Sequence, residues 1–505
     1  MSTEESRAEL GKKKLTLFDV TNLVVGAIIG ADIFVAASFG ANLMGPASLL
    51  VWVAAGVIMM VIALNFGQCA TVFPVVGGPY AYAKEALGKF AGFMTGWSTW
   101  LAEWLSLAVF PLAFTKYLAY FYPLTEIQQV AVQAVFMAFL TITNILGTKV
   151  AGRANDILTI GKLAPLLLFI IIGLFYTTSY LSQTVYNLNP FAPNGYSQFG
   201  GALVLIVWAY AGFELSTIPA GAVEKPEKTI PRAILVGMLI VLAFYLSINF
   251  IIFSVIPSSQ LGNMSTPLIT SAQTITGYNP YLTSIITGYN PYLTSQQVIP
   301  SSWAAALVTG IIGIGALLSI SGANESGMLG TSQISYAMAL DGLFPKAFGK
   351  LHSKYKTPYI GLIIQSVSAF VAAIIGNLEL LISASVFFLA LAYLVTCISS
   401  PVLHKKFPKA RKGFRRSLIL AVIGAVSCVY LITQIEHLEL IIGIVLLAIG
   451  IPIYVFFTPK KELSELRVYL SQRQLLRRAR EVENVFLAHL LTHTKQLSRR
   501  IRRIR

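Results

Sequence analysis

The chain contains twelve apolar segments of about 20 residues or more, and this feature excludes most folds. Such a segment is long enough to cross the hydrocarbon core of a bilayer as a helix. With 56% hydrophobic and 11% charged residues, a soluble protein could not cover this apolar surface. The sequence therefore predicts an all-α integral membrane protein with twelve transmembrane helices, at about 18–41, 48–73, 91–121, 127–147, 157–179, 200–222, 233–256, 303–338, 358–377, 380–403, 417–435 and 438–457.

Basic residues mark one side of these segments. Between Arg7 and Arg416 the chain has 24 Lys and Arg residues, and all but Lys116 fall in the N-terminus or at every second connection. Cytoplasmic loops carry such an excess of positive charge. We therefore expect a multi-pass protein of the plasma membrane with both termini in the cytoplasm.

The net charge of +16 does not indicate nucleic-acid binding, because residues 458–505 alone carry 13 basic and 4 acidic residues. Leucines among these arginines favour a basic amphipathic helix lying on the anionic inner leaflet, and the alternative is a partly disordered charged tail. The sequence contains no Walker A motif, no nucleophile–base set and no metal-ligand cluster. It predicts no enzyme, no catalytic or metal-binding residue and no cofactor.

The first ten segments divide into two sets of five, and the first helix of each set is interrupted near its midpoint. Glycine and a carboxylate in mid-bilayer are costly unless that backbone lines a cavity. Paired interruptions of this kind indicate a transporter built from inverted repeats. Helix packing through small residues is the alternative for any single glycine. The residues concerned are Gly26, Gly30 and Asp32 in GAIIGADIF, and Gly212 and Glu214 in WAYAGFELSTIPAG.

The predicted organisation has four parts. They are a cytoplasmic N-terminus at 1–15, a ten-helix inverted-repeat core at 16–404, two additional transmembrane helices at 405–457 and a basic cytoplasmic tail at 458–505. An outward loop contains the decapeptide ITGYNPYLTS twice, at 275–284 and 286–295. A recent duplication and a specialised outer lid are the two interpretations.

Five stretches resemble the amino acid–polyamine–organocation superfamily of transporters over about Leu15 to Pro408. They are GAIIGADIF (26–34), FPVVGGPYAYAKEALGKFAGFMTGW (73–97), ILTIGKLAP (157–165), GFELSTIPAGAVEKPEKTIPRAI (212–234) and ISYAMALDGLFPKAFGKLHSKYKTP (334–358). The resemblance implies the leucine-transporter fold, with a five-plus-five inverted repeat, two C-terminal helices and alternating access.

The resemblance also implies a binding site for a zwitterion at the two interruptions. Backbone N–H groups of Gly30, Ala31 and Ile33 would hold a carboxylate, because the N-terminus of a helix attracts anions. Carbonyls near Trp208, Ala209 and Tyr210 would receive the amine, and Tyr210 and Phe213 would form a gate or side-chain pocket. Gly26, Gly212 and Glu214 would support the two helix breaks.

Asp32 departs from the family pattern, which places a small residue followed by glycine here. Three interpretations stay open: a cap on the second half of helix 1, a partner for a cationic group of the substrate, and a partner for Lys162. If Asp32 occupies the anion site itself, it repels a substrate carboxylate and favours an amine. Members of this fold that carry monoamines place an aspartate in this segment, which is an analogy.

Lys162 matches a helix 5 lysine that, in some proton-coupled relatives, replaces a sodium ion held between helices 1 and 8. Protonated, it would bind helix 1 carbonyls, and deprotonated, it would release them. The helix 8 partner would be Ser319 or Ser321. A lysine that snorkels to the inner interface is the alternative.

Glu103, on helix 3, faces a cationic substrate or hydrogen-bonds within the bundle. We expect secondary active transport of amino acids or related amines, driven by protons. The partners would be this small-molecule substrate, protons and the bilayer. An exchanger without net proton flux is the nearest alternative, and a membrane nutrient sensor is the alternative from another class.

Overall fold

Helices are the regular secondary structure of the part of the chain that the structure describes. The computed structural model describes residues 15–75, 77–146, 148–216, 223–276, 303–407 and 414–458, and these ranges contain no β-strand. The only bridge between extended residues in these ranges joins Leu15 to Val223. Several predicted features lie outside the described ranges. They are the tail from residue 459 onward, most of the duplicated loop, and residues 217–222.

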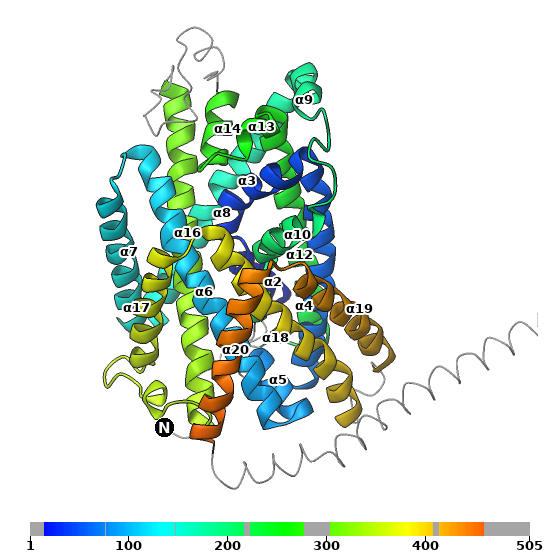
Figure 1. The fold of residues 1–505 in the computed structure, drawn as a ribbon, viewed down its shortest axis with the longest axis vertical. Helices are drawn as coiled ribbons and strands as arrows, with labels where there is room; N and C mark the ends of the chain where they lie inside the picture. Colours follow the sequence, from blue (N-terminus) through cyan, green and yellow to red (C-terminus); the bar gives the residue numbers. More distant parts are fainter. Residues whose placement is uncertain are drawn as a thin grey trace, which may run out of the picture.

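The helices follow the predicted apolar segments along the chain (Figure 1). Their bounds are α2 Leu17–Ile28, α3 Asp32–Met44, η2 Gly45–Ala47, α4 Ser48–Val72, α5 Gly78–Leu87, α6 Lys89–Phe121, α7 Glu126–Leu146, α8 Thr148–Ser179, α9 Leu181–Asn187, α10 Phe199–Val207, η3 Trp208–Tyr210, α11 Phe213–Ser216, α12 Pro226–Val255, α13 Ser258–Leu261, α14 Pro267–Ile275, α16 Trp303–Leu340, η5 Lys346–Gly349, α17 Tyr359–Ile375, α18 Leu378–Lys406, α19 Phe414–Thr433 and α20 His437–Phe457.

Eight helical runs in the described ranges are long and apolar enough to cross a membrane, by length and composition. One of them, Asp32–Val72, comprises α3 and α4 with the short turn η2 between them. Four further apolar helices are shorter, with 10–17 residues each, namely Leu17–Ile28, Phe199–Tyr210, Tyr359–Ile375 and Ser417–Thr433. The first two are short because the helix stops inside the apolar segment.

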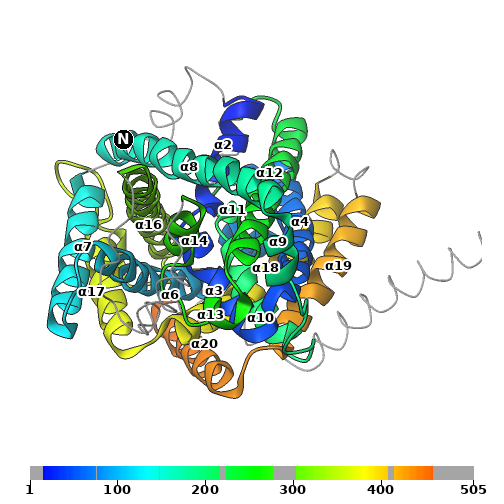
Figure 2. The ribbon, with the colours of Figure 1, turned by 90° about the horizontal axis from the view of Figure 1, so that it is seen from above.

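The helices form a bundle in which α7 and α17 lie on one side and α19 on the opposite side (Figures 1 and 2). Side chains such as Phe139, Val367 and Phe456 on the peripheral helices are 62%, 59% and 81% exposed. Exposed apolar side chains of this density suit a helix surrounded by lipid. The fold is therefore that of a multi-pass membrane protein.

Two interruptions of helical structure lie within this bundle. Helix α2 begins with a capping box between Thr16 and Asp19 and ends at Ile28, and α3 begins at Asp32. Helix α10 continues through η3 and stops before Gly212, whose φ is +109°. We call residues 29–31 the first gap and residues 211–212 the second gap. Each gap interrupts the backbone hydrogen bonding of an apolar segment.

Candidate functional site

The second gap touches the last turn of α2, directly before the first gap, through backbone atoms. A Cβ atom placed on Gly212 would lie 2.4 Å from the carbonyl oxygen of Ala27 and 2.9 Å from its carbonyl carbon. Glycine is therefore required at position 212, both for the positive φ and for this close approach. Residues 185 positions apart in the sequence thus bring two sets of unpaired peptide groups together.

Asp32 places its carboxylate inside the first gap. The backbone N–H of Gly30 donates a hydrogen bond to Asp32 Oδ1 at 3.0 Å, and the side chain of Asp32 is 5% exposed. Asp32 is the first residue of α3, whose N-cap residue Ala31 makes no side-chain hydrogen bond. The carboxylate therefore binds the Gly30 N–H of the gap and also interacts with its own backbone N–H, which is the first N–H of α3.

Tyr245 of α12 connects both gaps. Its hydroxyl group contacts Asp32 Oδ2, the carbonyl oxygen of Ala209 at 3.0 Å and the carbonyl oxygen of Ile28 at 3.4 Å. A hydroxyl group has one hydrogen to donate, so these three acceptors share one donor. The side chain is fully buried. Tyr245 therefore stabilises carbonyl groups that the interrupted helices leave without partners.

Lys162 of α8 and Ser319 of α16 bind carbonyl groups around the first gap. The Lys162 ammonium donates to the carbonyl oxygen of Gly26 at 2.5 Å, and the side chain is 1% exposed. Ser319 Oγ donates to the carbonyl oxygen of Gly30 at 3.1 Å, whereas Ser321 Oγ donates to Leu317 within its own helix. Of the two serines, Ser319 is therefore the one that lies at the gap.

Lys162 and Asp32 lie close enough to interact electrostatically, but they are not in contact. Both side chains lie in the part of the chain that the structure describes, and their charged atoms form no ion pair within 4.0 Å. The positive charge of Lys162 is held instead by the carbonyl oxygen at the end of α2, where the helix dipole is negative. Each charge of the first gap therefore has its own backbone partner.

The second gap repeats the arrangement of Asp32. The N–H of Gly212 donates to Glu214 Oε2 at 3.0 Å, and the hydroxyl group of Tyr393 donates to the same oxygen at 3.1 Å. Glu103 of α6 is 9% exposed, and its carboxyl group interacts directly with that of Glu214. Adjacent carboxylates repel unless a proton lies between them, so this pair is a place where one proton can reside.

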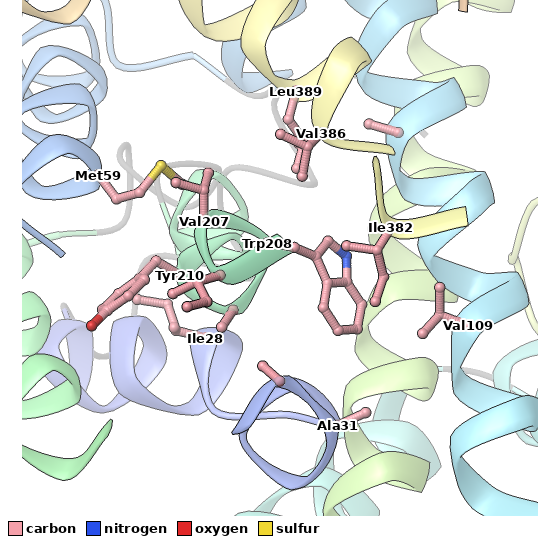
Figure 3. Close-up of a cluster of buried hydrophobic side chains, with 14 of the residues drawn as sticks. Ile28, Ala31, Met59, Val109, Val207, Trp208, Tyr210, Ile382, Val386 and Leu389 are labelled. Carbon is pink, nitrogen blue, oxygen red and sulfur yellow. The ribbon is translucent and has the colours of Figure 1, made fainter. Parts of the chain in front are cut away.

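The residues of η3 point to different sides of the second gap. Figure 3 shows the Trp208 indole extending toward Val109 and Ile382 above Ala31, with Tyr210 on the other side of the turn. Trp208 Nε1 donates to Ser106 Oγ at 3.0 Å, and the Tyr210 hydroxyl donates to the carbonyl oxygen of Trp52 at 2.9 Å. These bonds fix both large side chains.

The other residues predicted for the site are also buried here. Ala31, Ile33 and Ala209 have no exposed surface, and Phe213 packs edge-on against Phe66 at 5.3 Å between ring centroids. The structure thus brings all predicted site residues except Ser321 to the two gaps or directly beside them.

A cavity of about 450 Å³ reaches the second gap from the end of the molecule that carries α5. Glu214 lies on its wall together with Thr99. Near the surface, Lys84 of α5 forms an ion pair with Asp341 at 2.5 Å, and Tyr80 also hydrogen-bonds this carboxylate. The cavity therefore links an acidic residue of a gap to one surface of the molecule.

Tyr245 and Tyr393 were not among the predicted site residues. They lie in apolar segments at positions 213 and 179 residues from the carboxylates that they contact. No local pattern separates them from the other tyrosines of the chain, which has 22. To find them from the sequence, one would have to identify each tyrosine together with its carboxylate, because Tyr245 contacts Asp32 and Tyr393 contacts Glu214.

Replacing Tyr245 with phenylalanine should lower solute uptake at least about tenfold. The change leaves a carboxylate and two buried carbonyl groups without their shared donor, and each buried unpaired polar group costs about 1–3 kcal/mol. The measurement is uptake into proteoliposomes together with the thermal unfolding midpoint. Tyr186→Phe, at a side chain that is 71% exposed, is the control. Equal uptake by both variants would show that the Tyr245 hydroxyl is dispensable.

Buried charges facing interrupted helices inside an apolar bundle define a membrane transporter, because such groups line a path for a polar solute. Comparison with known proteins agrees with this class. The family model described as "Amino acid permease" matches residues 19–471. The chain belongs to this amino acid permease family.

Individual relatives support the same conclusion. A branched-chain amino acid permease of Bacillus subtilis is 27% identical over 470 residues, which cover 89% of this chain and 94% of the relative. A serine/threonine exchanger of B. subtilis is 25% identical over 88% of this chain and 96% of the relative. A methylthioribose transporter of the same organism is 25% identical over 91% of this chain and 96% of the relative. These relatives are transporters, which confirms the prediction that the protein is a transporter and no enzyme.

Proposed function

We propose that the protein is a secondary active transporter of amino acids or related amines, and that protons drive it across the plasma membrane by alternating access. The contact between the second gap and the end of α2 carries this proposal, because it places carbonyl and N–H groups of both interrupted helices around one buried region. Carbonyl groups of the turn at Trp208–Tyr210 suit the amine of a substrate. The relatives named above include carriers of amino acids and of methylthioribose.

Proton coupling is proposed to run through Lys162. Its ammonium binds the Gly26 carbonyl oxygen while Ser319 binds that of Gly30, so α8 and α16 both hold the first gap. Loss of the proton from Lys162 would weaken the contact to α2 and allow this helix to move relative to α8. Asp32 lies beside this contact and completes the group of charges that responds to protonation.

The topology proposed for this mechanism has twelve crossings and both termini in the cytoplasm. Helices α2 and α3 form one interrupted crossing, and α10, η3 and α11 belong to the other. The ten-helix core at 16–404 is a five-plus-five inverted repeat, and 405–457 adds two helices. Residues 1–15 and the basic tail at 458–505 lie on the cytoplasmic side, with the tail on anionic lipid.

Replacing Ser319 with alanine should lower proton-driven uptake about fivefold, because the Gly30 carbonyl loses a hydrogen bond worth about 1 kcal/mol. Ser321→Ala is a matched control, since Ser321 lies two residues away and bonds to its own helix. Initial uptake rates in proteoliposomes provide the measurement. A larger loss in the Ser321 variant would contradict the proposed role of Ser319.

The decisive experiment is transport by the purified protein in proteoliposomes. A panel of amino acids and amines is supplied with an imposed pH gradient, with a sodium gradient and with neither. We expect accumulation only with the pH gradient, inside alkaline. Uptake that follows sodium instead, or the absence of any uptake over the panel, would contradict the proposal.

Exchange is the second candidate function, and the names of two relatives favour it. They are the serine/threonine exchanger and an arginine/ornithine antiporter of Latilactobacillus sakei, which is 27% identical over 371 residues. Counterflow without a pH gradient, and no accumulation driven by one, would establish exchange. A nutrient sensor would lose signalling but keep uptake when residues 460–505 are deleted.

A further inference from the structure

The mouth of the cavity that reaches the second gap lies between α5 and the last turns of α16. Tyr80 and Lys84 line it from α5, and Tyr336, Leu340 and Asp341 line it from α16. In Figure 1, α5 lies at the lower end of the bundle, where α16 also finishes. A solute that leaves the second gap through this cavity therefore passes beside both helices.

Three side chains join these two helices at the mouth. The Lys84 ammonium and the Asp341 carboxylate form an ion pair at 2.5 Å, and the Tyr80 hydroxyl group donates to the same carboxylate oxygen. Tyr80 and Lys84 lie about one turn apart on α5, and the ammonium of Lys84 is 5.6 Å from the centre of the Tyr80 ring. Because all three residues line the cavity, their contacts hold two of its walls together.

Helix α5 is attached separately to its other neighbours. It packs against α6 and α18. The Lys406 ammonium at the end of α18 forms an ion pair with Glu85 at 2.5 Å and donates to the Glu85 carbonyl oxygen at 3.0 Å. The adjacent residues Lys84 and Glu85 thus connect α5 to two different helices. Loss of the Lys84 contact would free α5 from α16 and leave it attached to α18.

The contact between Lys84 and Asp341 is of a kind that can break and form again. The two side chains are 31% and 36% exposed, so water reaches both charges. Ion pairs in contact with water are individually weak, whereas separating a fully buried pair leaves an uncompensated charge. A partly exposed ion pair is therefore suited to a step that recurs in every transport cycle.

Two contacts between helices at the opposite end of the molecule are neutral. Ser38 Oγ of α3 donates to the carbonyl oxygen of Met264 at 2.8 Å, and Gln273 Nε2 of α14 donates to the Tyr120 hydroxyl group of α6 at 2.7 Å. Figure 1 shows α13 and α14 at the end away from α5. A change of charge at the mouth of the cavity therefore acts on one end of the molecule only.

We propose that Lys84, Asp341 and Tyr80 form a latch at the mouth of the cavity, and that breaking this latch lets α5 and α16 separate and opens the cavity wider to the cytoplasm. The inference rests on the proposed function, since it names the control of the path from the same site. Neither Asp32 nor Lys162 is among the residues that line the cavity, so the latch is distinct from the proton coupling proposed above.

The accessibility of a cysteine deep in the cavity tests the latch. Thr99 lines the cavity together with Glu214 of the second gap, so Thr99→Cys is labelled with a membrane-impermeant maleimide from the cytoplasmic face of inverted vesicles. The three native cysteines are buried, and the protein without the Thr99 change gives their background. Lys84→Glu places two carboxylates opposite each other and should raise the labelling rate at least fivefold. Lys84→Glu combined with Asp341→Lys restores an ion pair and should return the rate to within twofold of the parent.

Lys406→Gln is the matched control, because it removes the other ion pair of α5, also at 2.5 Å, and leaves the contact at the mouth intact. Labelling should then change less than twofold. Lys84→Gln removes the charge without adding repulsion and should raise the rate at least twofold, and the unfolding midpoint of each variant shows whether folded protein is labelled. Unchanged labelling in both Lys84 variants, equal acceleration in Lys406→Gln, or no recovery in the double variant would each overturn the latch.

The labelling needs no transported solute, so its result is independent of the substrate and of the driving ion. Failure of the latch would leave the transporter assignment intact, and a failure to find any transported solute would leave the labelling result valid. Labelling of Thr99→Cys from the opposite face of the membrane alone would overturn the assignment of the latch to the cytoplasmic side.

Discussion

Replacing Lys162 with alanine should abolish accumulation driven by a pH gradient and leave substrate binding detectable. The ammonium is the group that joins α8 to the carbonyl oxygen of Gly26, at 2.5 Å in a fully enclosed position. Alanine leaves this carbonyl without a partner, which costs about 1–3 kcal/mol, and removes the side chain proposed to carry the proton. Binding should survive because Asp32 and the turn at Trp208–Tyr210 keep their own contacts.

Three measurements on the Lys162 variant separate coupling from transport. Accumulation under a pH gradient should fall to the level of empty vesicles, counterflow of unlabelled against labelled substrate should persist, and stabilisation by substrate should remain. Lys116→Ala is the control, since that lysine is exposed on α6. Gradient-driven accumulation at the wild-type level in Lys162→Ala would remove this residue from the coupling mechanism.

Replacing Gly212 with alanine should eliminate uptake altogether. The residue has a φ of +109°, where a residue with a Cβ atom carries about 1–3 kcal/mol of strain. The new methyl group would also overlap the carbonyl oxygen of Ala27, which is backbone and has no rotamer to change. The second gap and the end of α2 must therefore separate, and Tyr245 can no longer contact the carbonyl groups of both Ile28 and Ala209.

The control for Gly212 isolates the overlap from the backbone strain. Gly88 has a φ of +100° and no atom within 4 Å of its Cβ position, so Gly88→Ala introduces similar strain without a steric conflict. Uptake and the unfolding midpoint of both variants are measured after purification. We expect a folded, active Gly88 variant, and equal damage in the two variants would show that strain alone explains the effect.

The sequence predicts the class of protein and the places where helical structure stops, because both depend on strong local signals. Long apolar segments identify membrane helices, and a glycine followed two residues later by a carboxylate identifies a place where the helix stops. Asp32 and Glu214 lie at those places in the structure. The family comparison confirms the transporter class.

The partners of these residues could not be derived from the sequence, because they depend on packing between distant segments. The sequence leaves three interpretations open for Asp32. In the structure its carboxylate accepts the Gly30 N–H and contacts Tyr245, and it forms no ion pair with Lys162. Ser319 and Ser321 were equivalent candidates until the orientation of α16 placed Ser319 against Gly30. A shift of two residues along a helix changes the direction of a side chain by about 200°.

The backbone contact between Gly212 and Ala27 limits how such a carrier can diverge. At most positions of a binding region, a different side chain can widen or narrow the space and so adapt it to a new solute. At this position both partners are main-chain atoms, whose size is the same in every protein. The distance between the two segments is thus set by atomic radii, and new selectivity has to arise from the residues around this fixed point.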